Sequence, residues 1–149
     1  MNIRMANLED AAPLVEFNQA MALETEGRQL DAQTLKSGVE AVFQDDKKGF
    51  YVVAESNEKI VGGLMITFEW SDWRSEWFWW IQSVYIMPEQ RGQGVYRKLY
   101  DFVKEKAQAQ GDVYGFRLYV EKENTRARQV YEKLGMDASH YLMYETKAE

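Results

Sequence analysis

A short glycine-containing turn, residues 91–96, holds the side chains and backbone of this sequence that are best suited to chemistry. Gly92 and Gly94 lack a Cβ, so an oxyanion can approach the main chain closely, and Arg91 can add charge-assisted hydrogen bonds. A helix that begins here has N–H groups without intrahelical partners, and its dipole places positive potential at the same end. The turn is therefore predicted to bind an anion such as a phosphate.

Two elements with different sequence periods must position this turn. Residues 81–86 are mostly β-branched or aromatic, and Pro88 cannot extend a ladder, so a strand is predicted to stop near Met87. A helix is predicted from at or just before Gly94 to a stop at Gly111. Its residues at helical spacing are Val95, Leu99, Phe102, Val103 and Lys106. A strand, a glycine turn and an amphipathic helix form the context that a Gly-x-Gly pattern requires, although a plain strand-to-helix connection has the same elements.

At this turn the sequence resembles the GNAT superfamily of N-acetyltransferases, whose signature is Arg or Gln, two residues, Gly, one residue, then Gly or Ala. The matching residues are Arg91, Gly92, Gln93, Gly94, Val95 and Tyr96. The resemblance implies that their main-chain amides hold the pyrophosphate of acetyl-coenzyme A. It also implies that the pantetheine arm pairs with the strand at Val84, Tyr85 and Ile86. Tyr96 departs from the pattern, because the family usually has a small residue there.

A second segment resembles the same family in its order of Asn, Ala three residues later, an aromatic residue seven later, then Leu-Gly and an apolar residue. The matching residues are Asn124, Ala127, Tyr131, Leu134, Gly135 and Met136. The resemblance implies that Asn124 hydrogen-bonds the cofactor arm and that Tyr131 is the general acid beside the thioester sulfur. Aminolysis of a thioester expels a thiolate, which a phenol can protonate. By spacing alone, Asn124 is an N-cap and Tyr131 a core aromatic.

Two further catalytic roles are less evident in the sequence. By resemblance, the main-chain N–H of Val84 is the candidate donor to the developing oxyanion. Family members often use a Glu on the central strand or the next one as the general base, and at comparable places this chain has Trp80 and Tyr119. The nearest carboxylates belong to Glu69, Glu76 and Glu121, and a water relay is equally open. His140, the only histidine, is interpreted as a loop residue, and no metal site is predicted.

All five tryptophans fall within eleven residues, with acidic residues between them. They are Trp70, Trp73, Trp77, Trp79 and Trp80. The cluster can be an aromatic cage for an amine, because ring faces and carboxylates both stabilise a cation. It can equally be core on one strand face and a dimer interface on the other, since alternate residues point oppositely. We favour the second interpretation, and with it a homodimer.

Composition narrows the class of protein. The chain has 149 residues, no cysteine and a formal net charge of −6. This length predicts one domain over residues 1–149 with a core of its own, and the missing cysteines exclude disulfides and thiol nucleophiles. No apolar run is long enough to span a membrane, so a soluble cytoplasmic protein is expected. The acidic balance argues against a nucleic-acid partner and leans toward a cationic substrate.

The remaining pattern predicts a single α/β layer structure. Strands are expected over residues 3–5, 50–54, 60–70, 77–86, 113–120 and 136–144. Helices are expected after a cap at Asp10, preferred to Asn7, after Asp31, from Gly94 and after Asn124. A helical crossover makes its two flanking strands parallel. The expected fold is therefore one mixed, mostly antiparallel sheet with a central parallel strand pair flanked by helices, as in acyl-CoA N-acyltransferases.

The resemblance leads to one main hypothesis and one rival. The main hypothesis is an N-acetyltransferase that moves the acetyl group of acetyl-CoA to a primary amine by direct attack in a ternary complex. The acceptor is a small molecule or a peptide. The rival is a non-catalytic CoA-binding sensor or interaction module, which the lack of an evident base permits.

Overall fold

The computed structural model describes residues 1–149 and divides into two compact units, Met1–Leu118 and Tyr119–Glu149. The first unit contains one five-stranded sheet whose strands neighbour one another in chain order. They are β1 (Asn2–Met5), β2 (Phe50–Ser56), β3 (Lys59–Ser71), β4 (Glu76–Ile86) and β5 (Val113–Arg117). All pairs are antiparallel except β4 with β5. The predicted mixed sheet with one parallel pair is confirmed.

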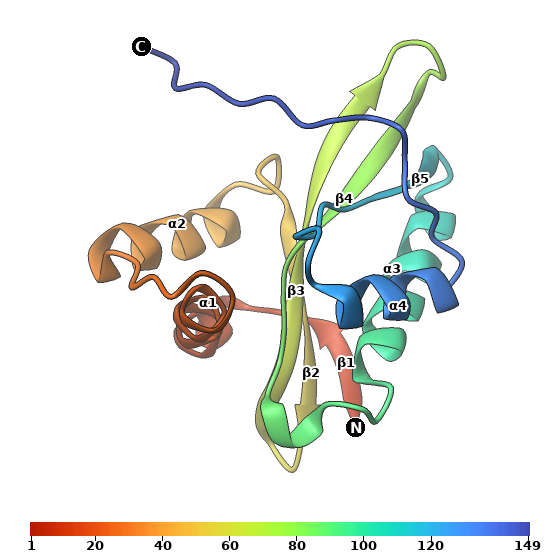
Figure 1. Cartoon of the computed structure of the whole chain (residues 1–149). Coiled ribbons are helices and arrows are strands. Elements are labelled where there is room, and N and C mark those ends of the chain that lie inside the picture. Colours follow the sequence, from red (N-terminus) through yellow and green to blue (C-terminus); the bar gives the residue numbers. More distant parts are fainter. The chain divides into compact units, whose positions relative to one another are not determined.

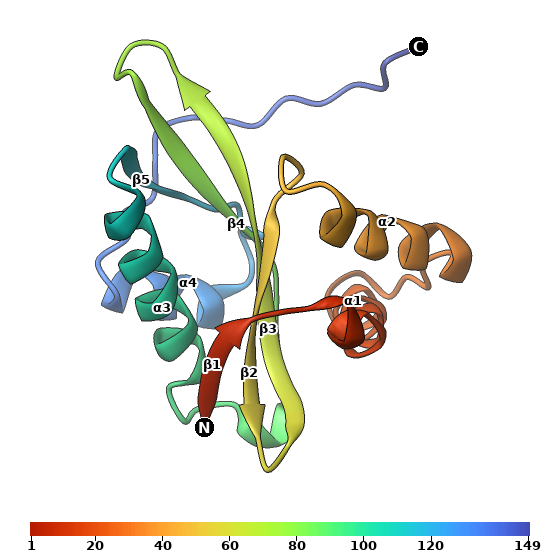
Figure 2. The same ribbon diagram turned by 180° about the vertical axis from the view of Figure 1, so that it is seen from behind.

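Helices cover both faces of this sheet. Figures 1 and 2 show α1 (Ala11–Glu26) and α2 (Ala32–Gln44) on one face and α3 (Val95–Gln110) on the other. Two short 3₁₀ turns, η1 (Leu8–Asp10) and η2 (Pro88–Gln90), precede α1 and α3. None of the helices combines the length and the apolar composition that a membrane span needs.

Strand alternation divides the core into two layers. Most of the largest fully buried side chains lie on the α3 side: Val52, Leu64, Ile66, Trp79, Leu99 and Val103. The layer beneath α1 and α2 contains Leu14, Phe17, Val39, Tyr51, Val53 and Tyr85. Successive residues of a strand point to opposite faces, so Trp79 enters the α3 layer while its neighbours Phe78 and Trp80 point the other way. Trp79 is thus a core residue, as the structural interpretation of the tryptophans predicted.

The predicted helix ends are confirmed except at the start of α1. The Asp31 carboxylate accepts from the Thr34 N–H at 2.9 Å and caps α2. Asp10 precedes α1 but makes no side-chain cap bond, so our preferred cap is wrong. Asn7 instead caps η1 in a capping box, and Asp10 accepts two hydrogen bonds from Arg4, at 2.8 and 3.0 Å. An arginine fork offers a carboxylate stronger bonds than one helix N–H does.

The second unit contains one helix, α4 (Thr125–Lys133), capped by the Asn124 side chain and followed by Gly135 at φ 93°. The strand predicted over residues 136–144 is wrong, because the chain beyond Gly135 has neither helix nor strand. Tyr141, Leu142 and Tyr144 are all exposed. A strand is stable only when its backbone groups pair with a partner and one face is buried, and this stretch has neither. The strand predicted over residues 113–120 is also shorter, ending at Arg117.

Candidate active site

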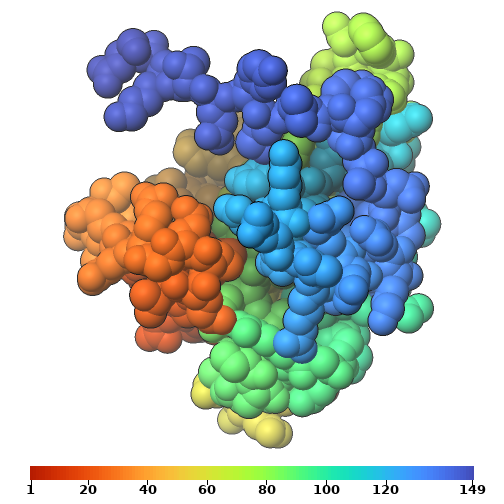
Figure 3. Space-filling view, viewed as in Figure 1, coloured from red at the N-terminus to blue at the C-terminus, as the bar shows by residue number.

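The turn between β4 and α3 is open to solvent. Gly92 and Gly94 have φ of 76° and 78°, in the left-handed region that favours glycine. A Cβ built at either position would meet no atom within 4 Å. Residues 91–94 are exposed, and the green surface of this region lies uncovered in Figure 3. The backbone here therefore has the conformation and the free space that an anion site requires.

The first residues of α3 are anchored by apolar packing. Val95 and Leu99 are 3% and 0% exposed, which fixes the helix start against the sheet. Tyr96, the residue that departs from the family signature, is also buried, and its ring stacks on Tyr100 with centroids 6.1 Å apart. Its ring thus packs along the helix flank, and its bulk is accommodated in the core.

Arg91 is held in place by a residue that sequence reasoning missed. Its Nη2 donates to Glu24 Oε1 at 2.9 Å, and its Nε donates to the Ile86 carbonyl at 2.8 Å. The Tyr85 hydroxyl donates to the other oxygen of Glu24 at 2.6 Å. The hydrogen bond from Tyr85, with the added effect of Arg91, lowers the pKa of the Glu24 carboxyl. Glu24 therefore ties the end of α1 to both the strand and the turn.

A bulge interrupts β4 beside the predicted oxyanion donor. Gln82 pairs with Met65 and Tyr85 with Gly63, so Ser83 and Val84 together face Leu64. Ser83 has φ of 52°, which is unusual for a residue with a side chain. A bulge leaves one residue outside the ladder and is frequent next to active sites. The interruption lies where the Val84 N–H was predicted to act.

This backbone conformation gives a prediction about stability. A left-handed conformation costs an L-residue energy that glycine does not pay, so Ser83→Gly should be more stable than Ser83→Ala by about 1 kcal/mol. Both variants lack the hydroxyl, and the comparison therefore isolates the backbone. Urea denaturation midpoints measure the difference. Equal midpoints would contradict a positive φ at this position in solution.

A cavity of about 590 Å³ opens on the α1–α2 side of the sheet and reaches this bulge, since Ser83 is one of its lining residues. Its wall includes the link between the two helices, at Arg28, Gln29 and Leu30. The cavity joins the link to the bulge, and a small molecule inside it would lie beside Ser83.

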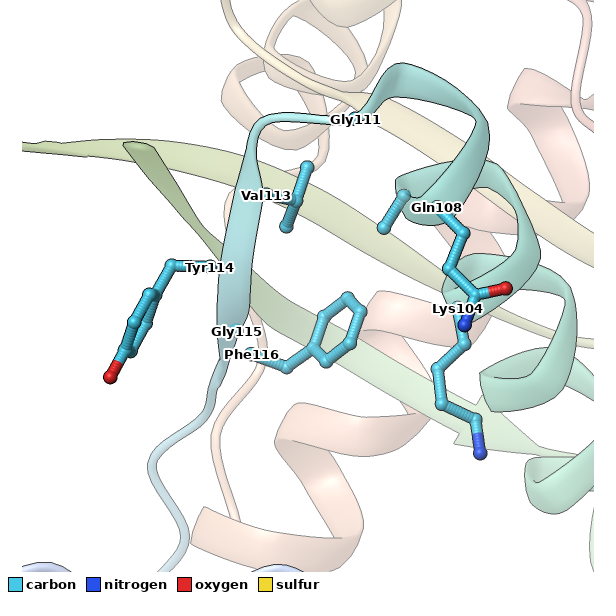
Figure 4. A pocket seen from close by; sticks show the side chains of 8 residues that line it. Lys104, Gln108, Gly111, Val113, Tyr114, Gly115 and Phe116 are labelled. Carbon is cyan, nitrogen blue, oxygen red and sulfur yellow. The ribbon is translucent and has the colours of Figure 1, made fainter. Parts of the chain in front are cut away.

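A second cavity, of about 370 Å³, lies between the C-terminal half of α3 and β5 (Figure 4). Phe116 and Val113 point toward it from β5, whereas Tyr114 points to the other side of the strand. Lys104 and Gln108 line it from α3. This cavity lies at the opposite end of α3 from Gly94 and is therefore separate from the glycine turn at residues 91–96.

The carboxylates considered as bases in this unit lie far from the bulge. Glu76 begins β4, eight residues before Val84, which corresponds to about 26 Å of strand. Glu69 pairs with Phe78, about 20 Å from Val84 along the strand. Burial raises the pKa of the Glu69 carboxyl, but hydrogen bonds from Trp80 at 2.8 Å and Arg117 at 2.9 Å outweigh it and lower the pKa. Neither residue has the position of a direct base.

The other predicted residues lie in the second unit. The Asn124 side-chain oxygen accepts from the Ala127 N–H at 3.1 Å, so Asn124 acts as an N-cap, and its amide NH₂ is not used by that bond. Tyr131 lies on α4, and burial raises the pKa of its phenol. A raised pKa keeps the phenol protonated at neutral pH, which is the form that a general acid needs.

The sequence and the fold were compared with known protein families and solved structures. Residues 6–136 match the family model described as the acetyltransferase (GNAT) family. A crystal structure of a possible acetyltransferase from Clostridium difficile 630 is 42% identical, with a TM-score of 0.91 over 99% of this chain and 97% of that one. A predicted acetyltransferase from Clostridium acetobutylicum, whose structure contains acetyl-CoA, is 20% identical, with a TM-score of 0.79 over 97% and 95% of the two chains. At that identity the likeness shows a shared fold.

A curated relative is also found. The S-alkylcysteine N-acetyltransferase of Bacillus subtilis (strain 168) is 24% identical over 107 residues. The match covers 69% of this chain and 58% of the relative, so this chain spans little more than half of the relative's length.

Proposed function

This chain belongs to the acetyltransferase (GNAT) family, and we propose that it is an acetyl-CoA-dependent acyltransferase that acetylates a primary amine by direct attack within a ternary complex. One observation carries the proposal. A cavity large enough for a small molecule opens at the β4 bulge, and β4 leads directly into the open glycine turn at the start of α3. The name of the curated relative, which describes the acetylation of an amine, supports the choice of acceptor.

Different residues of the first unit bind different parts of acetyl-CoA. The main-chain amides of Arg91, Gly92, Gln93, Gly94, Val95 and Tyr96 bind the pyrophosphate, helped by the dipole of α3. Val84, Tyr85 and Ile86 pair with the pantetheine arm as an additional strand would. Glu24 holds Arg91 beside the phosphates. Acetyl-CoA supplies an activated acyl group in its thioester.

The chemical step needs a donor for the oxyanion, an acid and a proton acceptor. The amine nitrogen attacks the carbonyl carbon, the C–N bond forms, and the C–S bond breaks. The Val84 N–H donates to the oxygen as negative charge develops on it. Tyr131 gives its proton to the departing thiolate, and Asn124 holds the cofactor arm. Water or Glu121 accepts the proton that the amine loses, because the carboxylates of Glu69 and Glu76 lie about 20 Å or more from Val84 along the strands.

A non-catalytic CoA-binding sensor remains the second candidate, favoured by the position of these carboxylates. Turnover separates the two functions. We expect thiol release from acetyl-CoA, followed with a thiol reagent, to depend on added amine and to yield N-acetyl product in equal amount. Tight cofactor binding without thiol release, across a panel of monoamines, amino acids and polyamines, would support the sensor and reject the enzyme.

We also propose that the chain acts as one functional domain over residues 1–149, located in the cytoplasm and without a nucleic-acid partner. The family model spans both compact units, which supports the single domain. The net charge of −6 opposes binding to phosphate backbones.

Oligomeric state is a further prediction. Residues 67–71 of β3 extend past the last pair with β2, and at the tip of this hairpin Trp73 is 89% exposed and Trp70 49%. Soluble domains rarely leave large aromatic patches uncovered, so we propose a homodimer through this hairpin. Sedimentation equilibrium should show a dimer, and the double variant Trp70→Ser, Trp73→Ser should sediment as a monomer. A wild-type protein that is monomeric at every accessible concentration would remove the dimer.

A further inference from the structure

The residues that line the cavity beside Ser83 favour one chemical class of acceptor. From its lining we propose that the acceptor is an apolar primary amine that carries a carboxylate, and that a cation of the lining, Arg28 or Lys48, binds this carboxylate. The inference rests on the proposed acetyl transfer and names its substrate class.

The interior surface of the cavity is mostly apolar. Val39 and Tyr51 are 2% and 4% exposed, and Leu35 and Met65 complete the same wall. Burial raises the pKa of the Tyr51 phenol to about 12, so this ring carries no charge at neutral pH. A volume of about 590 Å³ lies within the usual range of small-molecule pockets, about 300–1,000 Å³. The wall therefore favours an acceptor with an aliphatic or aromatic body.

The charged residues of the lining favour an anion on that body. Asp31 is the only acidic residue in the lining, and its Oδ2 already accepts from the Thr34 N–H at 2.9 Å and from the Thr34 hydroxyl at 2.7 Å. A second ammonium group would find only this one carboxylate, of which Oδ1 is unused, against two cations in the same wall. Arg28 and Lys48, in contrast, both line the cavity. The lining thus opposes a polycation, despite the acidic balance of the whole chain.

Both cations keep donors for a ligand. Arg28 Nη1 lies 3.5 Å from Glu26, and Lys48 Nζ lies 3.1 Å from Asp45, and neither of these acids lines the cavity. A guanidinium has five N–H donors and an ammonium three, so each ion pair leaves donors unused. The side chains of Arg28 and Lys48 are 66% and 53% exposed, which places them at the mouth, while Ser83 lies half-buried at the bulge. A carboxylate can therefore stay near water while the amine enters.

Matched amines test the class of acceptor. L-leucine is compared with 3-methylbutylamine, and 6-aminohexanoate with pentylamine, because each pair differs only by the carboxylate. The values of kcat/KM are taken per mole of unprotonated amine. We expect at least one carboxylate-bearing amine to exceed its partner by about tenfold or more, the size of one charged hydrogen bond. Preference for the neutral amine in both pairs, or for spermidine over all four, would overturn the inference.

Two variants test the residues that carry it. In the double variant Arg28→Gln, Lys48→Gln, the preference for the carboxylate-bearing amine should fall about tenfold, toward equality. Lys36→Gln is the matched control, because Lys36 is exposed on α2 and does not line the cavity. An unchanged preference in the double variant, with thermal unfolding like that of wild type, would also overturn the inference.

A binding measurement separates this inference from the proposed function. Calorimetry with L-leucine and with 6-aminohexanoate, in the presence of CoA, needs no turnover. Binding of either that is lost in the double variant but kept in Lys36→Gln supports the carboxylate site, even if no amine releases thiol and acetyl transfer itself is rejected. Thiol release with amines while neither probe binds would keep the enzyme and reject the carboxylate site.

Discussion

Replacement of Tyr131 by Phe is expected to lower kcat by about 10²- to 10⁴-fold, because it removes the proposed general acid while it keeps the ring. Affinity for acetyl-CoA should change little, since the phenol acts on the thiolate only as the C–S bond breaks. Burial already holds the pKa of this phenol above its ordinary value, so the acid form persists from neutral to moderately alkaline pH. The measurement is single-turnover kinetics, in which product release does not limit the rate.

A control for this variant lies in the same unit. Tyr144 is 89% exposed, and Tyr144→Phe removes a phenol of the same kind at a surface position. It should leave kcat unchanged. A Tyr131→Phe enzyme that turns over at the wild-type rate would make Tyr131 a packing residue of α4 and leave Asn124 with its cap alone.

Replacement of Gly94 by Asp is expected to abolish the rise in melting temperature that acetyl-CoA produces. A ligand that binds only the native state stabilises it by mass action, so the shift reports cofactor binding directly. The substitution adds a Cβ at φ 78° and a negative charge where the phosphates are proposed to lie. Gly94→Ala, which adds the Cβ without the charge, should weaken the shift less. Thermal unfolding with and without saturating acetyl-CoA measures both.

The strain of a side chain at positive φ needs its own control. Gly111 ends α3 at φ 92°, also in open space, so Gly111→Asp introduces the same kind of strain at the other end of the same helix. This variant should lower the melting temperature of the free protein and keep the shift on adding acetyl-CoA. A Gly94→Asp protein that is folded and still shows the full shift would rule out the glycine turn as the phosphate site.

The fold and the position of the glycine turn, residues 91–96, follow from local patterns in the chain. Pro88 ends a strand because it lacks a backbone N–H, and Gly111 permits a helix stop because glycine adopts a positive φ at little cost. The cap at Asp31 likewise depends on atoms three residues away. A helix between two strands of one sheet fixes their parallel direction. Short-range rules of this kind predict the helices and strands. They also predict the glycine turn from Arg91 to Gly94.

The environment of the site was decided by contacts that no local pattern contains. Glu24 meets Arg91 across 67 residues of sequence, and the cavity wall combines residues as far apart in the chain as Asn18 and Ser83. The bulge at Ser83 exists because the register of β4 against β3 slips by one residue, which depends on both strands at once.

The two secondary-structure errors have the same cause. The place of Asp10 in the sequence predicts a helix cap, but Arg4 on β1 offers this carboxylate stronger hydrogen bonds. Residues 136–144 have the composition of a strand, yet a strand forms only where a partner accepts its hydrogen bonds. Local patterns therefore define which secondary structure each segment can form and where the glycine turn lies. Only the tertiary structure decided which partners each segment meets, because pairing energies depend on groups that are distant along the chain.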